Sequence, residues 1–147
     1  MGAKNPKRKP RPGVDEYGRT PLHYAAADGD TSQVEKLLRT GLLRKAADPN
    51  ALDDNGWSPL HFAAQAQSAP VTAALLQAGA DVSLRDSFGN TPLFRAVSSF
   101  RGDGSVIQLL RSAGADPIAP NHSGVTPVEF ARTVANYDIA EFFTDLP

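Results

Sequence analysis

The chain has 147 residues, the size of one ordinary domain, and a net charge of −1. It contains no cysteine, which excludes disulfides, thiolate nucleophiles and thiolate metal sites, and no run of about 18 apolar residues that could span a bilayer. Its basic N-terminus lacks the apolar segment of a secretory signal, so we expect a cytoplasmic protein.

The first 13 residues differ in charge from the rest. They hold five cations and no acid, whereas residues 14–147 hold 10 cations and 16 anions, a charge of −6. Prolines and charges cannot bury a core, so residues 1–13 are expected to form a disordered, solubilising tail. A nuclear-import signal or a nucleic-acid patch is the alternative for this basic run.

Beyond the tail, one short motif recurs four times. Its copies are residues 20–23 (TPLH), 58–61 (SPLH), 91–94 (TPLF) and 126–129 (TPVE), with starts 38, 33 and 35 residues apart. A glycine-ended turn precedes each copy, at residues 15–18, 53–56, 86–89 and 121–124. Recurrence at this period predicts one supersecondary unit that is stacked several times.

Two helices are expected in each unit. A hydroxyl residue followed by proline is typical of a helix N-terminus, because the missing proline N–H has no intrahelical partner to lose. Paired apolar residues at helical spacing then predict a second helix. These apolar residues are Val34, Leu37 and Leu38; Val71, Leu75 and Leu76; Val106, Ile107 and Leu110; and Ile139, Phe142 and Phe143.

These motifs resemble those of the ankyrin-repeat family over about residues 15–143. The resemblance implies an all-α solenoid of four repeats joined by β-turn or hairpin loops, at about residues 15–52, 53–85, 86–120 and 121–147 of a domain spanning 14–147. It also implies that the turns and first helices line a concave face.

Three departures from the repeat pattern stand out. The first repeat has five extra residues at 42–46, and the third has two extra residues within 99–104, which should lengthen its helix–helix loop. Such insertions are thermodynamically inexpensive, so each is either neutral or part of a partner surface. In the fourth repeat Val128, Glu129 and Arg132 replace the usual residues, as suits a terminal cap with a wetter outer face.

Catalysis is not expected. His23 and His61 occupy the same place in successive repeats, where an imidazole can bond back to the capping residue, and His122 belongs to a turn tip. A catalytic histidine occurs once, whereas these two recur, so we interpret them as structural. The sequence contains no metal-ligand spacing, phosphate-binding loop or nucleophile elbow, and we expect no cofactor.

Partner contacts are expected where the repeat leaves residue choice free. The resemblance to the ankyrin-repeat family implies that these positions are the turn tips, the residue after the turn glycine and the end of the first helix. Tyr17, Trp57 and Phe88 lie on successive turns, where an exposed aromatic ring would provide large rigid contact area. The alternative is that each ring folds onto a neighbouring turn. The expected contact residues are Glu16, Tyr17, Arg19, Asp28, Asp54, Asn55, Trp57, Gln65, Arg85, Phe88, Asn90, Ser98 and His122.

The resemblance implies a non-catalytic protein-binding module, monomeric when free. One hypothesis is a stoichiometric inhibitor similar to small bacterial ankyrin proteins that act as immunity proteins, with the acidic body steering a basic partner such as a toxin. The alternative is a eukaryotic-type regulator or scaffold whose tail is a nuclear-import signal. Small-molecule substrates, membranes and nucleic acid are not expected as partners.

Overall fold

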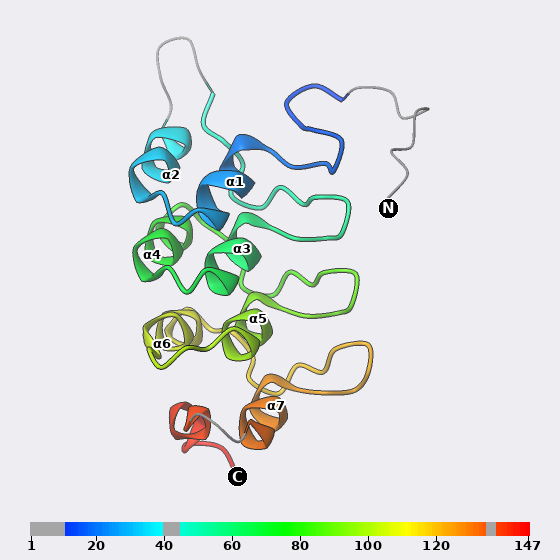
Figure 1. Ribbon diagram of the computed structural model, residues 1–147, viewed down its shortest axis with the longest axis vertical. Coiled ribbons are helices and arrows are strands. Elements are labelled where there is room, and N and C mark those ends of the chain that lie inside the picture. Colours follow the sequence, from blue (N-terminus) through cyan, green and yellow to red (C-terminus); the bar gives the residue numbers. More distant parts are fainter. Residues whose placement is uncertain (1–10, 40–44, 135–137) are drawn as a thin grey trace.

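The computed structural model describes residues 11–39, 45–134 and 138–147. It forms an elongated stack with three components side by side (Figure 1). The first helices of the repeats make one column: α1 (Pro21–Ala27), α3 (Pro59–Gln65), α5 (Pro92–Ser98) and α7 (Pro127–Thr133). The second helices α2 (Thr31–Leu38), α4 (Ala69–Gln77) and α6 (Ser105–Ser112) make another, and the turns project from the opposite side of the first column.

The described residues contain no strand, so the expected all-α repeat fold is confirmed. Consecutive turns nevertheless bond to one another through their backbones, and the Asp54 N–H donates to the Tyr17 carbonyl at 2.9 Å. In the same way, the Ser87 N–H donates to the Asn55 carbonyl at 2.9 Å. The four turns therefore form a regular ladder that holds their tips in register.

An aspartate or asparagine side chain closes each turn. In the second turn, Oδ1 of Asp53 accepts the N–H groups of Asn55 and Trp57, both at 2.9 Å. Asp15, Asp86 and Asn121 accept the corresponding pairs at 2.9 to 3.0 Å. The turn glycines Gly18, Gly56, Gly89 and Gly124 have φ of 76° to 79°, a backbone conformation that needs glycine.

Helix caps follow the predicted chemistry. Ser58, Thr91 and Thr126 each accept the backbone N–H three residues later, and the proline that follows each cap opens its helix. Beyond α4 and α6, Gly79 and Gly114 have φ of 92° and 93°, as expected of glycines that end helices.

The core lies between the two helix columns. Small residues such as Ala26 and Ala64 let neighbouring first helices approach closely, and larger aliphatic groups fill the remaining space. Because each helix is only seven to nine residues long, its stability comes from this packing rather than from helix propensity. The fully buried large side chains include Leu22, Val34, Leu60, Val71, Leu75, Leu93, Ile107, Leu110, Ile139 and Phe143.

Histidines connect successive repeats within this core. The Thr20 N–H donates to Nδ1 of His23 at 2.9 Å, and Nε2 of His23 lies 3.0 Å from the Trp57 carbonyl oxygen. His61 repeats the arrangement with the Ser58 N–H at 3.1 Å and the Asn90 carbonyl at 2.9 Å. Since the N–H can only donate and the carbonyl can only accept, each imidazole is neutral with its proton on Nε2. The structural interpretation of both histidines is confirmed.

The last repeat corrects one expectation. Its second element is not an α-helix but the 3-10 helix η1 (Ile139–Phe143), which buries Ile139 and Phe143 against the core. Arg111 of α6 holds this segment by donating to the Phe142 carbonyl at 2.7 Å and to both Asp145 carboxylate oxygens at 2.7 Å. Within the described residues, this single short turn covers the core beside α7.

The longer loop of the third repeat contacts this closing segment. Its residues 99–104 separate α5 from α6, as the two-residue insertion predicted. The Phe100 ring lies 5.7 Å from the Phe142 ring, and Gly104 is buried beneath Phe142. The Phe142 side chain of the C-terminal segment therefore packs against the inserted loop.

Gly104→Ala should destabilise the protein, because an added Cβ would collide with the Phe142 ring. Gly104 has a φ of −86°, so backbone strain does not contribute. Overpacking of this kind costs about 1–3 kcal/mol of unfolding free energy, measurable by urea titration. In a Phe142→Ala background the same substitution should be nearly neutral, and an equal cost in both backgrounds would contradict the contact.

Two expectations lie wholly or largely outside the described residues: the tail, apart from residues 11–13, and the insertion at 42–46, apart from residues 45 and 46. Arg11, at the tail's end, donates to both carboxylate oxygens of Asp54 at 3.0 and 3.2 Å. Among the described helices, none is long and apolar enough to cross a membrane.

Candidate functional site

One position of the first helix carries a large side chain in every repeat. It is the fourth residue after the helix cap, occupied by Tyr24, Phe62, Arg95 and Phe130. In the first three repeats buried residues flank it on both sides, but Tyr24 itself is 41% exposed and Phe62, Arg95 and Phe130 are half-buried. The position therefore forms a row along the first-helix column, facing the turns.

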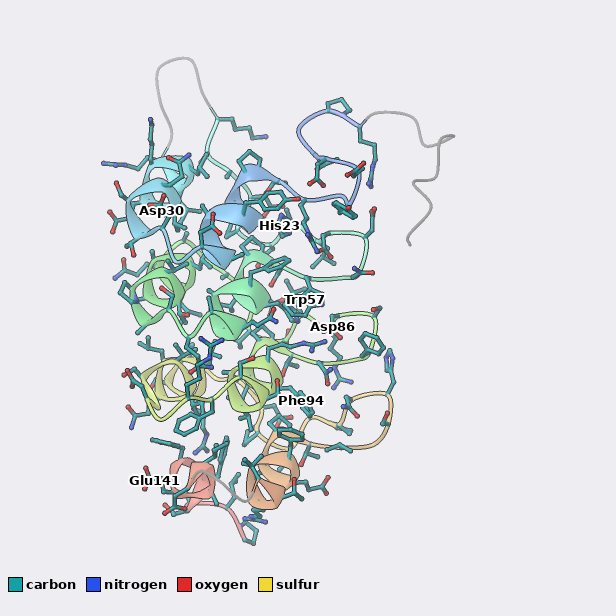
Figure 2. The ribbon with its side chains drawn as sticks, viewed as in Figure 1. His23, Asp30, Trp57, Asp86, Phe94 and Glu141 are labelled. Atoms are coloured by element: carbon teal, nitrogen blue, oxygen red, sulfur yellow. The ribbon has the colours of Figure 1, made fainter. Side chains whose placement is uncertain are left out.

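Aromatic rings and guanidinium groups alternate along this row and the adjoining turns. The Arg19 guanidinium lies 5.8 Å from the Tyr24 ring centre and 5.2 Å from that of Phe62. The centres of the Phe62 and Trp57 rings are 4.8 Å apart, and the guanidinium carbon of Arg95 lies 4.5 Å from the centre of the Trp57 ring. We call Arg19, Tyr24, Trp57, Phe62 and Arg95 the aromatic–arginine strip. Figure 2 shows Trp57 beside the first helices, near Asp86.

Buried turn carboxylates hold the two arginines of the strip. The Asp53 and Asp86 side chains are 1% and 0% exposed, and each uses its Oδ1 to close its own turn. Oδ2 of Asp86 accepts from Nε and Nη2 of Arg95 at 3.0 and 2.6 Å. Oδ2 of Asp53 instead accepts from Nε of Arg19 at 3.2 Å, because Phe62 stands where Arg95 stands in the next repeat and has no donor.

In the first repeat, a tyrosine hydroxyl donates a hydrogen bond to the equivalent carboxylate oxygen. The Tyr24 hydroxyl donates to Oδ2 of Asp15. Although burial acts to raise the pKa of Asp15, this hydrogen bond and those from the Arg19 and Tyr17 N–H groups lower it below its usual value. The bond to the carboxylate raises the pKa of Tyr24, so the phenol remains protonated near neutral pH.

Burial acts to lower the pKa of Arg19, but hydrogen bonds to Tyr24 and Asp53 outweigh burial and raise it above the ordinary value. The guanidinium is thus a permanent cation fixed by its neighbours, with 27% of its side chain still exposed.

A hollow of about 220 Å³ opens beside Arg19. Trp57 and Phe62 supply aromatic surface to it, and Asn55 and Gln65 supply amides. Arg19 is the charged residue in this lining. The hollow therefore combines one cation, two amides and two rings, a set that can bind a small polar group with an apolar neighbour.

The expected contact residues occupy different environments. Arg19 and Trp57 join the strip and are half-buried, so Trp57 is neither a free turn tip nor part of the deep core. Asn55 and Gln65 are exposed and line the hollow beside them. The other exposed ones are Glu16, Tyr17, Asp28, Asp54, Arg85, Phe88, Ser98 and His122.

Asn90 needs correction as a contact residue, because it is only 7% exposed. Its side-chain oxygen accepts from the Asn121 amide at 3.0 Å, and its carbonyl accepts from His61. It therefore joins the third turn to the fourth and offers little surface to a partner. Asp53 is buried for a similar reason, since it closes a turn and holds Arg19.

Sequence reasoning missed Tyr24, Phe62 and Arg95. The signal was available, since in all four copies the same repeat position holds a large residue, two residues after a core leucine or valine and directly before an alanine. It was missed because in isolation a tyrosine or phenylalanine within a helix suggests a core residue.

The described histidines do not suggest catalysis. Both ring nitrogens of His23 and of His61 are used in hydrogen bonds within the core. Burial lowers the pKa of each imidazole, which favours the neutral form that these bonds need. In the portion of the chain that the structure describes, no group of three or more His, Asp or Glu side chains is placed to hold a metal ion.

Comparison with known proteins agrees with this architecture. A family model described as ankyrin repeats in three copies matches residues 25–121. A Danio rerio protein named as palmitoyltransferase ZDHHC13 is 40% identical over 93 residues, covering 60% of this chain and 14% of its own length. An ankyrin repeat-containing protein of Schizosaccharomyces pombe is 30% identical over 85% of this chain and 58% of its own.

Human SH3 and multiple ankyrin repeat domains protein 2 is 30% identical over 87% of this chain and 7% of its own. The chain thus spans 58% or less of the length of each of these three relatives. With the family match covering most of the stacked repeats, the chain belongs to the ankyrin-repeat family.

Proposed function

We propose that this chain is a non-catalytic module that binds a protein partner across the aromatic–arginine strip. The observation that supports the proposal is the continuous row of rings and guanidinium groups running from Tyr24 to Arg95. Tyrosine, tryptophan and arginine are the residues most enriched at binding hot spots. Here buried carboxylates fix both arginines in advance, so their ordering adds little entropic cost to association.

The size of the hollow favours a protein segment over a small molecule. Sites for small ligands are usually about 300–1,000 Å³ and bury most of the ligand. The hollow beside Arg19 measures about 220 Å³ and is lined from two repeats. It suits a single side chain of a partner that continues along the strip.

Trp57→Ala should weaken partner binding by about 2 kcal/mol or more, roughly a thirtyfold rise in Kd, with little loss of stability. The substitution removes the ring between Phe62 and Arg95, while the Trp57 carbonyl that bonds His23 remains. Calorimetric titration with a partner peptide, selected from a displayed random library on the full chain, measures the effect. Ile118→Ala, which removes another exposed apolar group, is the matched control and should bind normally.

An unfolded Trp57→Ala variant, or one that binds as tightly as the parent chain, would count against the strip. The selected peptides should also protect Tyr24 and Phe62 from solvent, because these rings adjoin Arg19.

The finer hypothesis of an inhibitor or immunity protein for a basic toxin rests on the net charge of −6 of residues 14–147. The names of the three relatives refer to neither toxins nor immunity, and all three come from eukaryotes. The regulator or scaffold hypothesis is compatible with those relatives, and localisation of the tagged chain with and without residues 1–13 tests its nuclear-import part. An association rate that does not change with salt would remove the electrostatic argument for a basic partner.

A further inference from the structure

Net charge is a poor guide to the strip, because the acidic side chains nearest to it are already used. Asp53 and Asp86 are buried, with both carboxylate oxygens accepting hydrogen bonds. Asp54, at the turn tip, receives Arg11. These three carboxylates are therefore satisfied within the chain, and the lining of the hollow offers rings, amides and the Arg19 guanidinium.

We propose that the hollow beside Arg19 binds a carboxylate side chain of the partner, followed by an apolar side chain that lies on Trp57 and Phe62. This inference rests on the proposed function, and it specifies which chemistry the partner brings. The occupant is an acidic residue next to an apolar one in a protein segment.

Arg19 is the primary recognition group. A guanidinium has five N–H donors in a planar fork; Nε of Arg19 donates to Asp53, and a further donor is used in the hydrogen bond to Tyr24. The terminal nitrogens thus retain donors for a second carboxylate, the geometry in which arginine binds most strongly. The stacking of Arg19 between Tyr24 and Phe62 keeps the fork in one orientation.

The amides of Asn55 and Gln65 complete the polar part of the hollow. Both residues are exposed, and each can rotate its NH₂ group toward a carboxylate oxygen. The lining contains no acidic residue that would repel a carboxylate. A lysine or arginine of a partner would instead meet the Arg19 cation at close range, which is unfavourable.

A larger hollow of about 380 Å³ lies between α2 and α4, but it does not favour one kind of ligand. Its lining contains both Glu35 and Arg39 and no aromatic ring. The hollow beside Arg19 is smaller, but its lining has a single sign of charge and two rings, so it defines a partner chemistry.

Introducing a positive or a negative charge at position 65 tests the proposal. Gln65 is exposed near the end of α3, so neither Gln65→Lys nor Gln65→Glu should disturb the fold. For a carboxylate ligand, Gln65→Lys should tighten binding roughly three- to tenfold and Gln65→Glu should weaken it by a similar factor. Gln108→Lys and Gln108→Glu, on the exposed side of α6, are the matched controls and should change Kd less than twofold.

The probes are peptides selected from a displayed library of random dodecamers on the full chain, then synthesised with each acidic residue also replaced by its amide. Trp57 is the chain's one tryptophan, so its fluorescence reports occupancy of the hollow directly. We expect enriched peptides to carry Asp or Glu beside Leu, Ile, Phe or Met, and the amide analogues to bind at least tenfold more weakly.

Opposite or absent charge effects would overturn the inference. Tighter binding to Gln65→Glu would mean a basic occupant, and equal binding to both Gln65 variants would mean that the hollow is not contacted. In either case, if the peptides bound Trp57→Ala more weakly than the parent chain, the proposed function would still be supported. If binding depended on neither Trp57 nor Phe62, the proposed function itself would fail.

Discussion

Asp86→Ala should destabilise the protein by about 3–5 kcal/mol, the range expected when one partner of a buried ion pair is removed. Its carboxylate accepts four hydrogen bonds, from the N–H groups of Phe88 and Asn90 and from two nitrogens of Arg95. Truncation would leave those donors without an acceptor at a site only 4% exposed. Urea unfolding followed by far-ultraviolet circular dichroism measures the loss.

The chain supplies its own comparison for this prediction. Asn121 closes the fourth turn with the same two hydrogen bonds, at 3.0 Å each, so an amide oxygen can do this part of the work. Asp86→Asn should therefore lose only the two bonds from Arg95 and cost less than Asp86→Ala. Arg95→Ala should be intermediate, because Oδ1 of Asp86 would remain satisfied. Equal effects of alanine and asparagine at position 86 would show that closing the turn matters less than we infer.

The regular features of this fold could be predicted because each is a local rule repeated in register. The turns that run from Asp or Asn to glycine, the hydroxyl and proline that open the first helices, and the Nδ1 bonds of His23 and His61 all depend on residues within four positions of one another. The turns and helix openings recur in all four copies and the histidine bonds in two, so copies in one chain support each other.

The candidate binding surface was less predictable, because it depends on contacts between repeats. Arg19 holds Asp53 of the next repeat only because Phe62 lacks a donor, and no local rule relates those three residues. Burial of Asn90 likewise depends on Asn121, a repeat away. The short η1 escaped prediction because a spacing of apolar residues over five positions fits an α-helix and a 3-10 helix equally well.

The third repeat shows how a substitution changes the connection between repeats. Phe94 stands where His23 and His61 stand, and a phenyl ring cannot bond the turn of the fourth repeat. In its place the Phe94 ring packs 5.3 Å from Phe130, and the Asn121 amide bonds Asn90. Two repeat junctions therefore depend on a neutral imidazole, and the third does not.

This difference leads to a dependence of stability on pH. Burial lowers the pKa of His23 and His61 in the folded chain, while an unfolded histidine titrates near about 6.5. The unfolded chain then binds more protons as the pH falls, so acid favours unfolding. The free energy of unfolding should reach its plateau well above pH 6.5 and should decrease as the pH falls below it. For two groups that stay neutral in the folded chain, the decrease between pH 7.5 and 5.5 is at most roughly 2–3 kcal/mol.

Urea titrations at pH 7.5, 6.5 and 5.5 measure this loss, and the slope identifies its source. His61→Phe, which copies the third repeat, should lower stability at every pH but remove about half of the pH dependence, because only His23 would remain buried in neutral form. Gln108→Ala, at an exposed and non-titrating position of α6, is the control and should leave the loss on acidification unchanged. A His61→Phe variant with the full pH dependence would mean that protons enter elsewhere, and the assignment of both imidazoles as neutral bridges between repeats would have to be abandoned.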